Sequence, residues 1–311
     1  MLKWIIRIAA ALAVFIIAAG WWLFAGFSKA PAKAPPGLLD IDQWRNLIRE
    51  ADGDLPTEVR VLEVGHDSAP MLAARAGAFT GQWLTSYNSV QIVFPGSTLV
   101  IGGALDRPTS EGMVQAPEDW SFDDAAYRTL VDSMLQADKV LMTHEHLDHV
   151  MAIARHPDAD ALAPRLWLNA PQTAALPQFA AGELPAALRD LPPRLDGTVQ
   201  LVAPGVVAIP MAGHTPGAQL LFITLQNGHE YLMIGDTVWS MSSIEDLTMR
   251  PVFTQFIVFD PNEDRDAIRT QIRAVHDLMQ ANPQLTVFPS HDRIWLGKLS
   301  ADGLISWGFA D

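Results

Sequence analysis

The sequence contains no cysteine. Disulfide bonds, thiolate zinc sites, cysteine nucleophiles and lipid attachment to a thiol are therefore excluded. Any metal ion that the chain binds must be held by histidine and carboxylate side chains, because these are the remaining strong ligands for such ions. Histidine is itself scarce, with nine in 311 residues, so a close group of histidines needs an explanation.

Basic residues are also few. The chain has 21 lysines and arginines against 35 aspartates and glutamates, which gives a formal net charge of -14. Such a charge repels phosphate backbones, so we expect no nucleic-acid partner. The length and the apolar content of 49% are sufficient for a domain with a sizeable core, which excludes disorder of the whole chain.

Charged residues are missing from the stretch between Ile8 and Phe27. As a helix this stretch is about 30 Å long, which matches the hydrocarbon core of a bilayer. We interpret residues 1–27 as a membrane anchor that leaves the rest of the chain on the extracytoplasmic, periplasmic side. The alternatives are a cleaved signal peptide with secretion of the domain, although a proline follows each candidate cleavage site, or a buried core helix.

Residues 28–51 connect the anchor to the main domain at 52–311. Ser28 to Gly37 is a Pro/Ala linker that we expect to be an extended spacer. The next residues repeat apolar side chains at helical spacing, and Asp40 followed by Gln43 resembles a capping box. This pattern predicts a short amphipathic helix that docks on the domain. The alternative, a helix lying on the membrane surface, is disfavoured by its acidic polar face.

The main domain alternates between short β-rich runs and helical patterns. This mixture predicts sheets covered by helices. The predicted strands are 58–64, 89–94, 98–102, 139–143, 165–168, 199–203, 206–211, 219–225, 230–234, 255–259 and 286–288. The predicted helices are 122–136, 149–155, 171–180 and 262–280, the last capped by Asp260 or Asn262. The Pro- and Ala-rich segment 156–195 is the best candidate for a variable lid.

The segment KVLMTHEHLDHVMAIA places three histidines and an aspartate within six positions. It reads as a strand followed by a loop and a helix. In an extended loop, His144 and His146 point the same way and can hold one ion, because side chains alternate along the chain. Asp148 and His149 follow where the chain turns into the helix, so they can reach a second ion beside the first.

Three further motifs each follow an apolar strand: GHTPG with His214, GDT with Asp236 and PSHD with His291. In α/β sheets, loops at the carboxyl ends of strands present the chemistry. Four such ends that bring together five histidines and two aspartates predict a dinuclear metal site with positions open to water.

The order HxHxDH, GHTPG, GDT and SHD resembles the metallo-β-lactamase superfamily of metallo-hydrolases, from roughly Glu58 to His291. The resemblance implies an α/β (α+β) fold, an αββα sandwich preceded here by a single transmembrane helix, with 52–311 as the catalytic domain. It implies one metal held by His144, His146 and His214, another held by Asp148, His149 and His291, and Asp236 between them. We expect two divalent ions, zinc first and iron or manganese as alternatives.

The resemblance itself is only weakly specific for the substrate. From the full ligand set and the apolar loops near it, we expect hydrolysis of a carboxylic ester, lactone or related amide by a hydroxide held between the two ions. Asp148 is a candidate to pass a proton to the leaving group. A phosphodiesterase is the first alternative, disfavoured by the acidic charge, and a glyoxalase II-like or persulfide dioxygenase-like enzyme is the second. A binding module without activity is disfavoured by the complete ligand set.

The substrate is less closely defined by the sequence. The loops next to Asp236 and before Phe122 are apolar, so Trp239 and Met241 are candidate walls for a hydrophobic small molecule, together with Met249, Met113 and Trp120. Ordinary core packing is the competing interpretation. Arg293 could fix a substrate carboxylate or form a surface salt bridge. The resemblance to lactonase-like members is moderate, and no tyrosine lies between His149 and His214 to act as an oxyanion donor.

Overall fold

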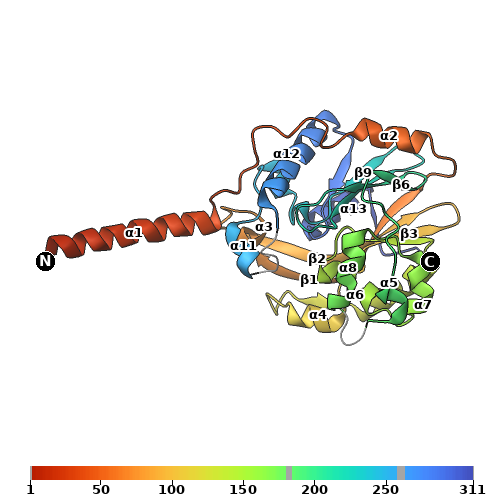
Figure 1. Cartoon of the computed structure of the whole chain (residues 1–311), viewed down its shortest axis with the longest axis horizontal. Coiled ribbons are helices and arrows are strands. Elements are labelled where there is room, and N and C mark those ends of the chain that lie inside the picture. Colours follow the sequence, from red (N-terminus) through yellow and green to blue (C-terminus); the bar gives the residue numbers. More distant parts are fainter. Residues whose placement is uncertain (1, 180–183, 258–262, 311) are drawn as a thin grey trace.

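The computed structural model describes residues 2–179, 184–257 and 263–310. Two β-sheets pack face to face, and helices cover the outer face of each (Figure 1). The chain therefore has the αββα arrangement that was expected.

The first sheet contains the longest strands. Its order is β11-β1-β2-β3-β5, and β4 also pairs with β1. The strand β5 lies parallel to β3, whereas β1, β2 and β3 are antiparallel neighbours. The bounds are β1 (Glu58–Pro70), β2 (Gln82–Val93), β3 (Thr98–Ile101), β4 (Ser121–Phe122), β5 (Lys139–Leu141) and β11 (Ser306–Trp307).

The second sheet has the order β10-β9-β8-β7-β6. Its last strand in the sequence, β10, again lies parallel to its neighbour β9, while the others are antiparallel. Both faces of the sheet are covered, which explains why a strand such as QLLFIT is apolar at four consecutive positions, Leu220 to Ile223. The bounds are β6 (Gln200–Ala203), β7 (Val206–Pro210), β8 (Gln219–Thr224), β9 (Glu230–Met233) and β10 (Thr286–Phe288).

Three clusters of buried apolar side chains correspond to the three contacts between layers. One lies between the sheets, a second joins the first sheet to its helices, and a third joins the second sheet to its helices. On the first sheet lie α5 (Asp124–Gln136), α6 (Leu147–Ala154), α7 (Ala159–Leu162), α8 (Ala170–Phe179) and α9 (Ala186–Arg189). On the second lie α2 (Ile41–Arg49), α10 (Ser242–Glu245) and α12 (Arg265–Ala281). Short helices α3 (Met71–Ala74), α4 (Arg107–Gly112), α11 (Val252–Ile257) and α13 (Arg293–Ala301) and the 3-10 turns η1 (Ala163–Arg165) and η2 (Gly235–Thr237) complete the described elements.

The predicted amphipathic helix is α2. The Asp40 carboxylate caps it by accepting a hydrogen bond from the Gln43 amide. Ile41, Trp44 and Ile48 are buried against the second sheet, where the Trp44 ring lies 5.4 Å from that of Phe222. The expectation that this helix docks on the domain is confirmed.

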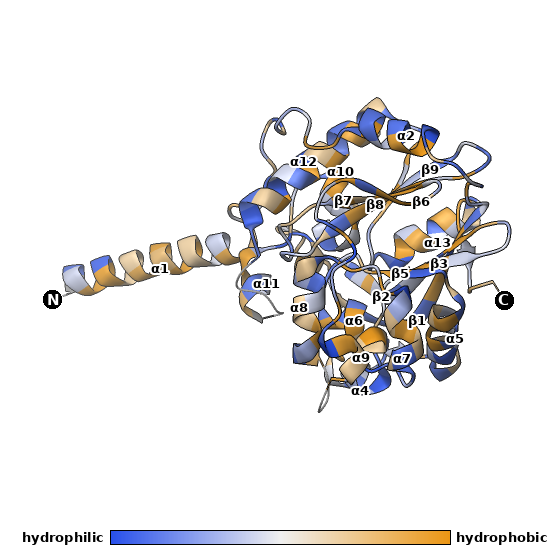
Figure 2. Ribbon diagram, turned by 45° about the vertical axis from the view of Figure 1, so that its right-hand side comes forward, coloured by the Kyte–Doolittle hydropathy of each residue, from blue (hydrophilic) through white to orange (hydrophobic). Residues whose placement is uncertain are grey.

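The apolar N-terminal run forms α1 (Leu2–Phe24), which projects from the domain (Figures 1 and 2). It is long and apolar enough to cross a membrane by length and composition. The linker after it, which we expected to be an extended spacer, contacts the domain. Ser28 is buried, its carbonyl accepts from the Met249 amide, and Ala30 donates to the Leu247 carbonyl. The linker thus adheres to the domain through backbone hydrogen bonds.

Two predicted strands are wrong. Residues 165–168 contribute one isolated bridge between Val140 and Leu166, because a 3-10 turn occupies the preceding residues. Gln255 to Ile257 belong to α11, whose Phe253 packs on Phe24 of α1, so tertiary contacts override the β-rich composition. The remainder of that predicted strand, and the predicted caps at 260 and 262, lie outside the described residues. The helix α12 begins after Asp264, whose carboxylate caps it.

Candidate metal centre

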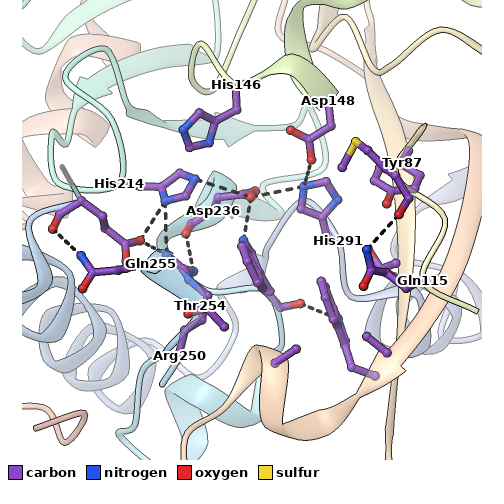
Figure 3. A pocket seen from close by; sticks show the side chains of 17 residues that line it. Tyr87, Gln115, His146, Asp148, His214, Asp236, Arg250, Thr254, Gln255 and His291 are labelled. Atoms are coloured by element: carbon purple, nitrogen blue, oxygen red, sulfur yellow. Dashed lines mark hydrogen bonds and ion pairs between the residues drawn. The ribbon is translucent and has the colours of Figure 1, made fainter. Parts of the chain in front are cut away.

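All seven predicted ligand side chains meet at one end of the two packed sheets. His144 and His146 lie in the loop after β5, and Asp148 and His149 lie in the first turn of α6. The other three follow strands of the second sheet: His214 after β7, Asp236 in η2 after β9, and His291 after β10. Figure 3 shows the labelled members of this set pointing toward a common centre.

The side chains form two groups, and in each group one ligand atom per residue lies within 4.8 Å of the others. The groups are His144, His146 and His214, and Asp148, His149, Asp236 and His291. Asp236 lies between them. Its Oδ2 is 3.8 Å from Nε2 of His214 and 3.3 Å from Nε2 of His291. This position suits a carboxylate that contacts two ions.

The donor atoms fit a metal ion. Within the part of the chain that the structure describes, Nε2 of His144 and Nε2 of His214 are buried without a hydrogen-bond partner. Buried polar atoms are normally paired, so two such nitrogens facing one centre need a partner that the protein does not supply. A divalent cation is such a partner, because neutral imidazole and carboxylate are its usual ligands.

The electrostatics of the site favour positive charge at its centre. Burial lowers the pKa of His144 well below its usual value and that of His214 to about 4, so both rings are neutral and able to ligate. Burial alone would raise the pKa of Asp148, but the charges of nearby histidines lower it to about 2. Burial opposes protonation of His291, yet the carboxylates around it raise its pKa well above normal. The centre therefore has a negative potential that favours cations.

Side chains behind the ligands hold the rings in place. The Nδ1 of His214 lies 2.9 Å from Oε1 of Glu263, and this carboxylate also accepts from Arg250. Arg250 in turn donates to the Asp236 carbonyl at 3.0 Å. Nδ1 of His291 donates to the Ser86 carbonyl at 2.8 Å. Such contacts on Nδ1 leave Nε2 of each ring directed at the centre.

The Glu145 side chain links two of the loops that carry ligands. Its carboxylate accepts from the Thr215 hydroxyl and from the Gly217 amide, each at 2.8 Å. A side chain at Gly217 would meet this carboxylate, because a Cβ there would lie 2.5 Å from Oε2. The second glycine of GHTPG thus allows the two ligand loops, one from each sheet, to be bound together.

A pocket adjoins the ligand groups (Figure 3). One wall is a stack in which Trp239 lies 5.3 Å from Trp83 with nearly parallel rings, and the Arg250 guanidinium lies 4.5 Å from the Trp239 ring. The Trp239 indole also donates to Oδ2 of Asp236 at 2.9 Å. The other lining residues, apart from the ligands, are Ala69, Ala73, Thr85, Tyr87, Met113, Gln115, Thr254, Gln255 and Glu263.

The predicted substrate residues are only partly placed at this pocket. Trp239 and Met113 line it. Met241 does not line it, and its side chain is buried in the core beside the second sheet. Arg293 is a correction: its guanidinium donates to Glu63 at 2.8 Å outside the pocket, which is the surface ion pair that competed with a binding role. The predicted lid, 156–195, contributes no described residue to the pocket lining.

Sequence reasoning missed Tyr87, Arg250 and Glu263. Tyr87 comes from β2, and its ring forms a T-shaped pair with that of His291, with the ring centres 5.8 Å apart. Burial, followed by the charge of Asp148, raises the pKa of Tyr87, so its hydroxyl remains a donor. Strand alternation groups Thr85 with Tyr87, but only the folded structure identifies the face on which they lie.

Several solved structures share this fold. An N-acyl homoserine lactone hydrolase with the product N-hexanoyl-L-homoserine at its catalytic metal centre has a TM-score of 0.57 and 12% identity, over 78% of this chain and 96% of that chain. A quorum-quenching N-acyl homoserine lactone lactonase has a TM-score of 0.55 and 13% identity, over 77% of this chain and 94% of that chain. A probable metal-dependent hydrolase from Staphylococcus aureus has a TM-score of 0.55 and 16% identity, over 78% of this chain and 91% of that chain.

No family model matches the sequence, and no curated protein matches it. The structural likeness, at such low identities, is a likeness of fold. The neighbours belong to the metallo-β-lactamase superfamily. From the two packed sheets, their covering helices and these neighbours, we conclude that the chain has the metallo-β-lactamase fold.

Proposed function

We propose that the protein is a metal-dependent hydrolase that cleaves a carboxylic ester, lactone or related amide. The observation that carries the proposal is the meeting of a group of three histidines with a group of two histidines and two aspartates at the wall of a partly apolar pocket. Two of the histidine Nε2 atoms are buried and lack protein partners. The lactone-cleaving neighbours support the choice of a carboxylic ester.

The two groups would each hold one divalent ion, and zinc is the expected metal. Bound there, the ions would supply a water of lowered pKa as nucleophile and would polarise the carbonyl oxygen under attack. His144, His146 and His214 would hold one ion. Asp148, His149 and His291 would hold the other, with Asp236 contacting both.

Side chains of the pocket would orient the substrate and move protons. Tyr87 lines the pocket and its raised pKa keeps its hydroxyl protonated, so it could donate a hydrogen bond to the oxygen on which charge develops. The Asp148 carboxylate lines the pocket 3.2 Å from Nε2 of His291, so it can take a proton from the attacking water and deliver it to the leaving oxygen. The Trp83 and Trp239 stack would exclude water from an apolar substituent of the substrate.

Metal analysis and a substrate panel test this function. We expect close to two divalent ions for each purified full-length chain and turnover of lactones or esters in preference to phosphodiesters and β-lactams. Asp236→Ala should lose metal and activity, whereas His276→Ala should keep both, because His276 pairs with Asp277 outside the site. A single iron per chain with consumption of oxygen would refute the hydrolase in favour of a redox enzyme.

The role of Asp148 has its own test. Asp148→Asn keeps the size of the side chain and removes its ability to carry a proton. We expect kcat to fall by about 100-fold or more, which is the usual contribution of such a group. Metal content should be measured on the same sample. Full turnover with both ions retained would show that Asp148 moves no proton.

We further propose that α1 is an uncleaved anchor and that the domain lies on the extracytoplasmic side. Its length and composition, and the absence of buried residues from its most apolar 18-residue window, support this role. The full-length chain should remain with membranes after an alkaline carbonate wash, and added protease should reach the domain in cells with a permeable outer layer. Recovery of a shortened, soluble chain would instead indicate a cleaved signal peptide.

A further inference from the structure

The domain end of α1 is packed against the segments that border the pocket. Phe24 of α1 lies 5.1 Å from Phe253 of α11, and Trp22 lies 6.4 Å from Phe256, as measured between ring centres. The Phe24 carbonyl also accepts from the Gly77 amide at 2.9 Å, in the loop after α3. Figure 1 shows α3 and α11 beside this end of α1. The anchor therefore meets the domain at two defined segments.

The same two segments form part of the pocket wall. Thr254 and Gln255, which line the pocket, are consecutive residues of α11 between the two phenylalanines that contact α1. Ala73, from α3, lines the pocket as well. One turn of α11 thus contacts the anchor on one side and the pocket on the other. The pocket consequently lies at the anchor end of the domain.

Exposed aromatic side chains gather at this end. Beyond α1, the exposed large apolar side chains among the described residues are Phe27, Phe79, Phe256, Ile294 and Trp307. The first three adjoin the end of α1: the Phe27 ring lies 5.6 Å from that of Trp21, Phe79 lies two residues after Gly77, and Phe256 faces Trp22. They are 63%, 69% and 68% exposed. Water alone gives no reason to concentrate them there, whereas aromatic rings are stabilised at a membrane surface.

We propose that these three phenylalanines form a membrane face that rests on the lipid bilayer, and that the pocket beside it takes its substrate from the bilayer. The substrate class is an amphiphile with a hydrolysable carboxylic ester or lactone and an apolar acyl chain. The position of the face follows from α1, which as the proposed anchor would enter the bilayer at the same point. The substrate class rests on the proposed hydrolase function, whereas the membrane face does not.

Apolar pocket walls match such a substrate. An acyl chain that leaves the bilayer needs an apolar surface along its route, since each methylene exposed to water costs about 0.8 kcal/mol. Trp83, Trp239 and Met113 provide such a surface inside the pocket, and Phe256 stands next to the lining residue Gln255. The polar reacting bond then reaches the histidines and aspartates at the inner end.

The membrane face can be tested without any substrate. Because the chain has no cysteine, Phe79→Cys, Phe256→Cys and Ile294→Cys each allow one nitroxide label in the full-length protein. In phosphatidylcholine vesicles, labels at 79 and 256 should be reached by oxygen dissolved in lipid and shielded from an aqueous nickel complex. The label at 294, on α13, should behave in the opposite way. Equal exposure of all three labels to the nickel complex would refute the membrane face.

Substrate delivery has a separate test with the metal-loaded full chain in the same vesicles. Two esters of the same type are compared: one has a long acyl chain and partitions into the vesicles, and the other has a short acyl chain and stays in water. Phe79→Ser combined with Phe256→Ser should lower kcat/KM for the long-chain ester about tenfold and leave the short-chain value unchanged. Ile294→Ser should change neither value.

These outcomes separate the two proposals. If the double variant lost kcat/KM equally for both esters, or for neither, delivery from the bilayer would be refuted and the proposed hydrolysis would stand. No turnover of any ester by the unaltered protein would refute the hydrolase, and the labelling result would then still decide the membrane face.

Discussion

At the scale of single residues, the orientation of His214 depends on a buried carboxylate. Glu263 contacts Nδ1 of this ring, and although burial raises its pKa, the charge of Arg250 lowers it to about 2. Glu263→Gln removes the charge but keeps the size, so we expect metal affinity to fall about 10- to 100-fold. Competition with a chelator measures this affinity. Glu245→Gln, on the exposed surface of α10, is the control, and equal affinities for the two variants would contradict the role.

A second residue, Tyr231, makes stability depend on pH far from the metal centre. Burial, followed by the charge of Glu58, raises its pKa from about 10 to about 12, and its hydroxyl donates to the Leu304 carbonyl. The folded state holds this proton more tightly than the unfolded state. The stabilising contribution is thus complete below pH 10 and is lost as the pH rises toward 12.

Urea unfolding at pH 9 and pH 11.5 tests this linkage. The unaltered protein should lose more stability between the two values than Tyr231→Phe, which has no proton to release. Other groups titrate in both proteins, so the difference between the two isolates Tyr231. Parallel losses would show that the hydroxyl has the same pKa in the folded and unfolded states.

The sequence predicts the metal ligands of the site but not the side chains around them. His144, His214, Asp236 and the other candidate ligands were found because each stands in a short motif directly after an apolar strand, and the structure brings them together. Tyr87 and Glu263 have no such motif. The place of Tyr87 depends on which face of β2 turns inward, and the place of Glu263 depends on the path of the chain just before α12. Neither can be deduced from the residues next to it in the sequence. Arg293 misled because closeness to His291 in sequence did not direct its side chain inward.

At the scale of elements, α2 fastens the linker region to the second sheet. Trp44 is fully buried against Phe222, so Trp44→Ala should cost about 3 to 5 kcal/mol by removing a large core side chain. Arg45→Ala on the same helix removes an ion pair with Glu230 at the edge of the core and should cost at most about 1 kcal/mol. Urea unfolding compares the two. A small loss for Trp44→Ala would mean that α2 is docked only loosely.

Elements with strong local signals were predicted well. The strand β10 has its predicted bounds, and α2 has its predicted cap, because apolar runs and capping residues are local features. By contrast, the composition of α11 favours a strand, but contacts with α1 decide its conformation. The full lengths of β1 and β2 were missed because polar residues such as His66, Asp67 and Ser68 continue the pairing beyond the apolar run.

At the scale of the whole molecule, the proposed ions would join two halves. The ligands between His144 and His149 follow a strand of the first sheet, whereas His214, Asp236 and His291 follow strands of the second. Removal of metal should therefore lower the unfolding temperature by several degrees or more, since a ligand at 1,000 times its Kd stabilises by about 4 kcal/mol. Calorimetry with chelator, followed by added zinc, checks this. An unchanged temperature would mean that the two halves hold together without the ions.

The separation of the ligands along the chain has a consequence for metal choice. His149 and His291 are neighbours in space, with Nε2 atoms 3.0 Å apart, but stand 142 positions apart in sequence. Closure of so long a loop comes late in folding, so a complete set of donors exists only once both sheets have docked. A site of imidazoles and carboxylates selects weakly among transition metals. The ion that it acquires is then set by the metal supply of the compartment where folding finishes, and a chain that folds after crossing a membrane would draw on the pool beyond it.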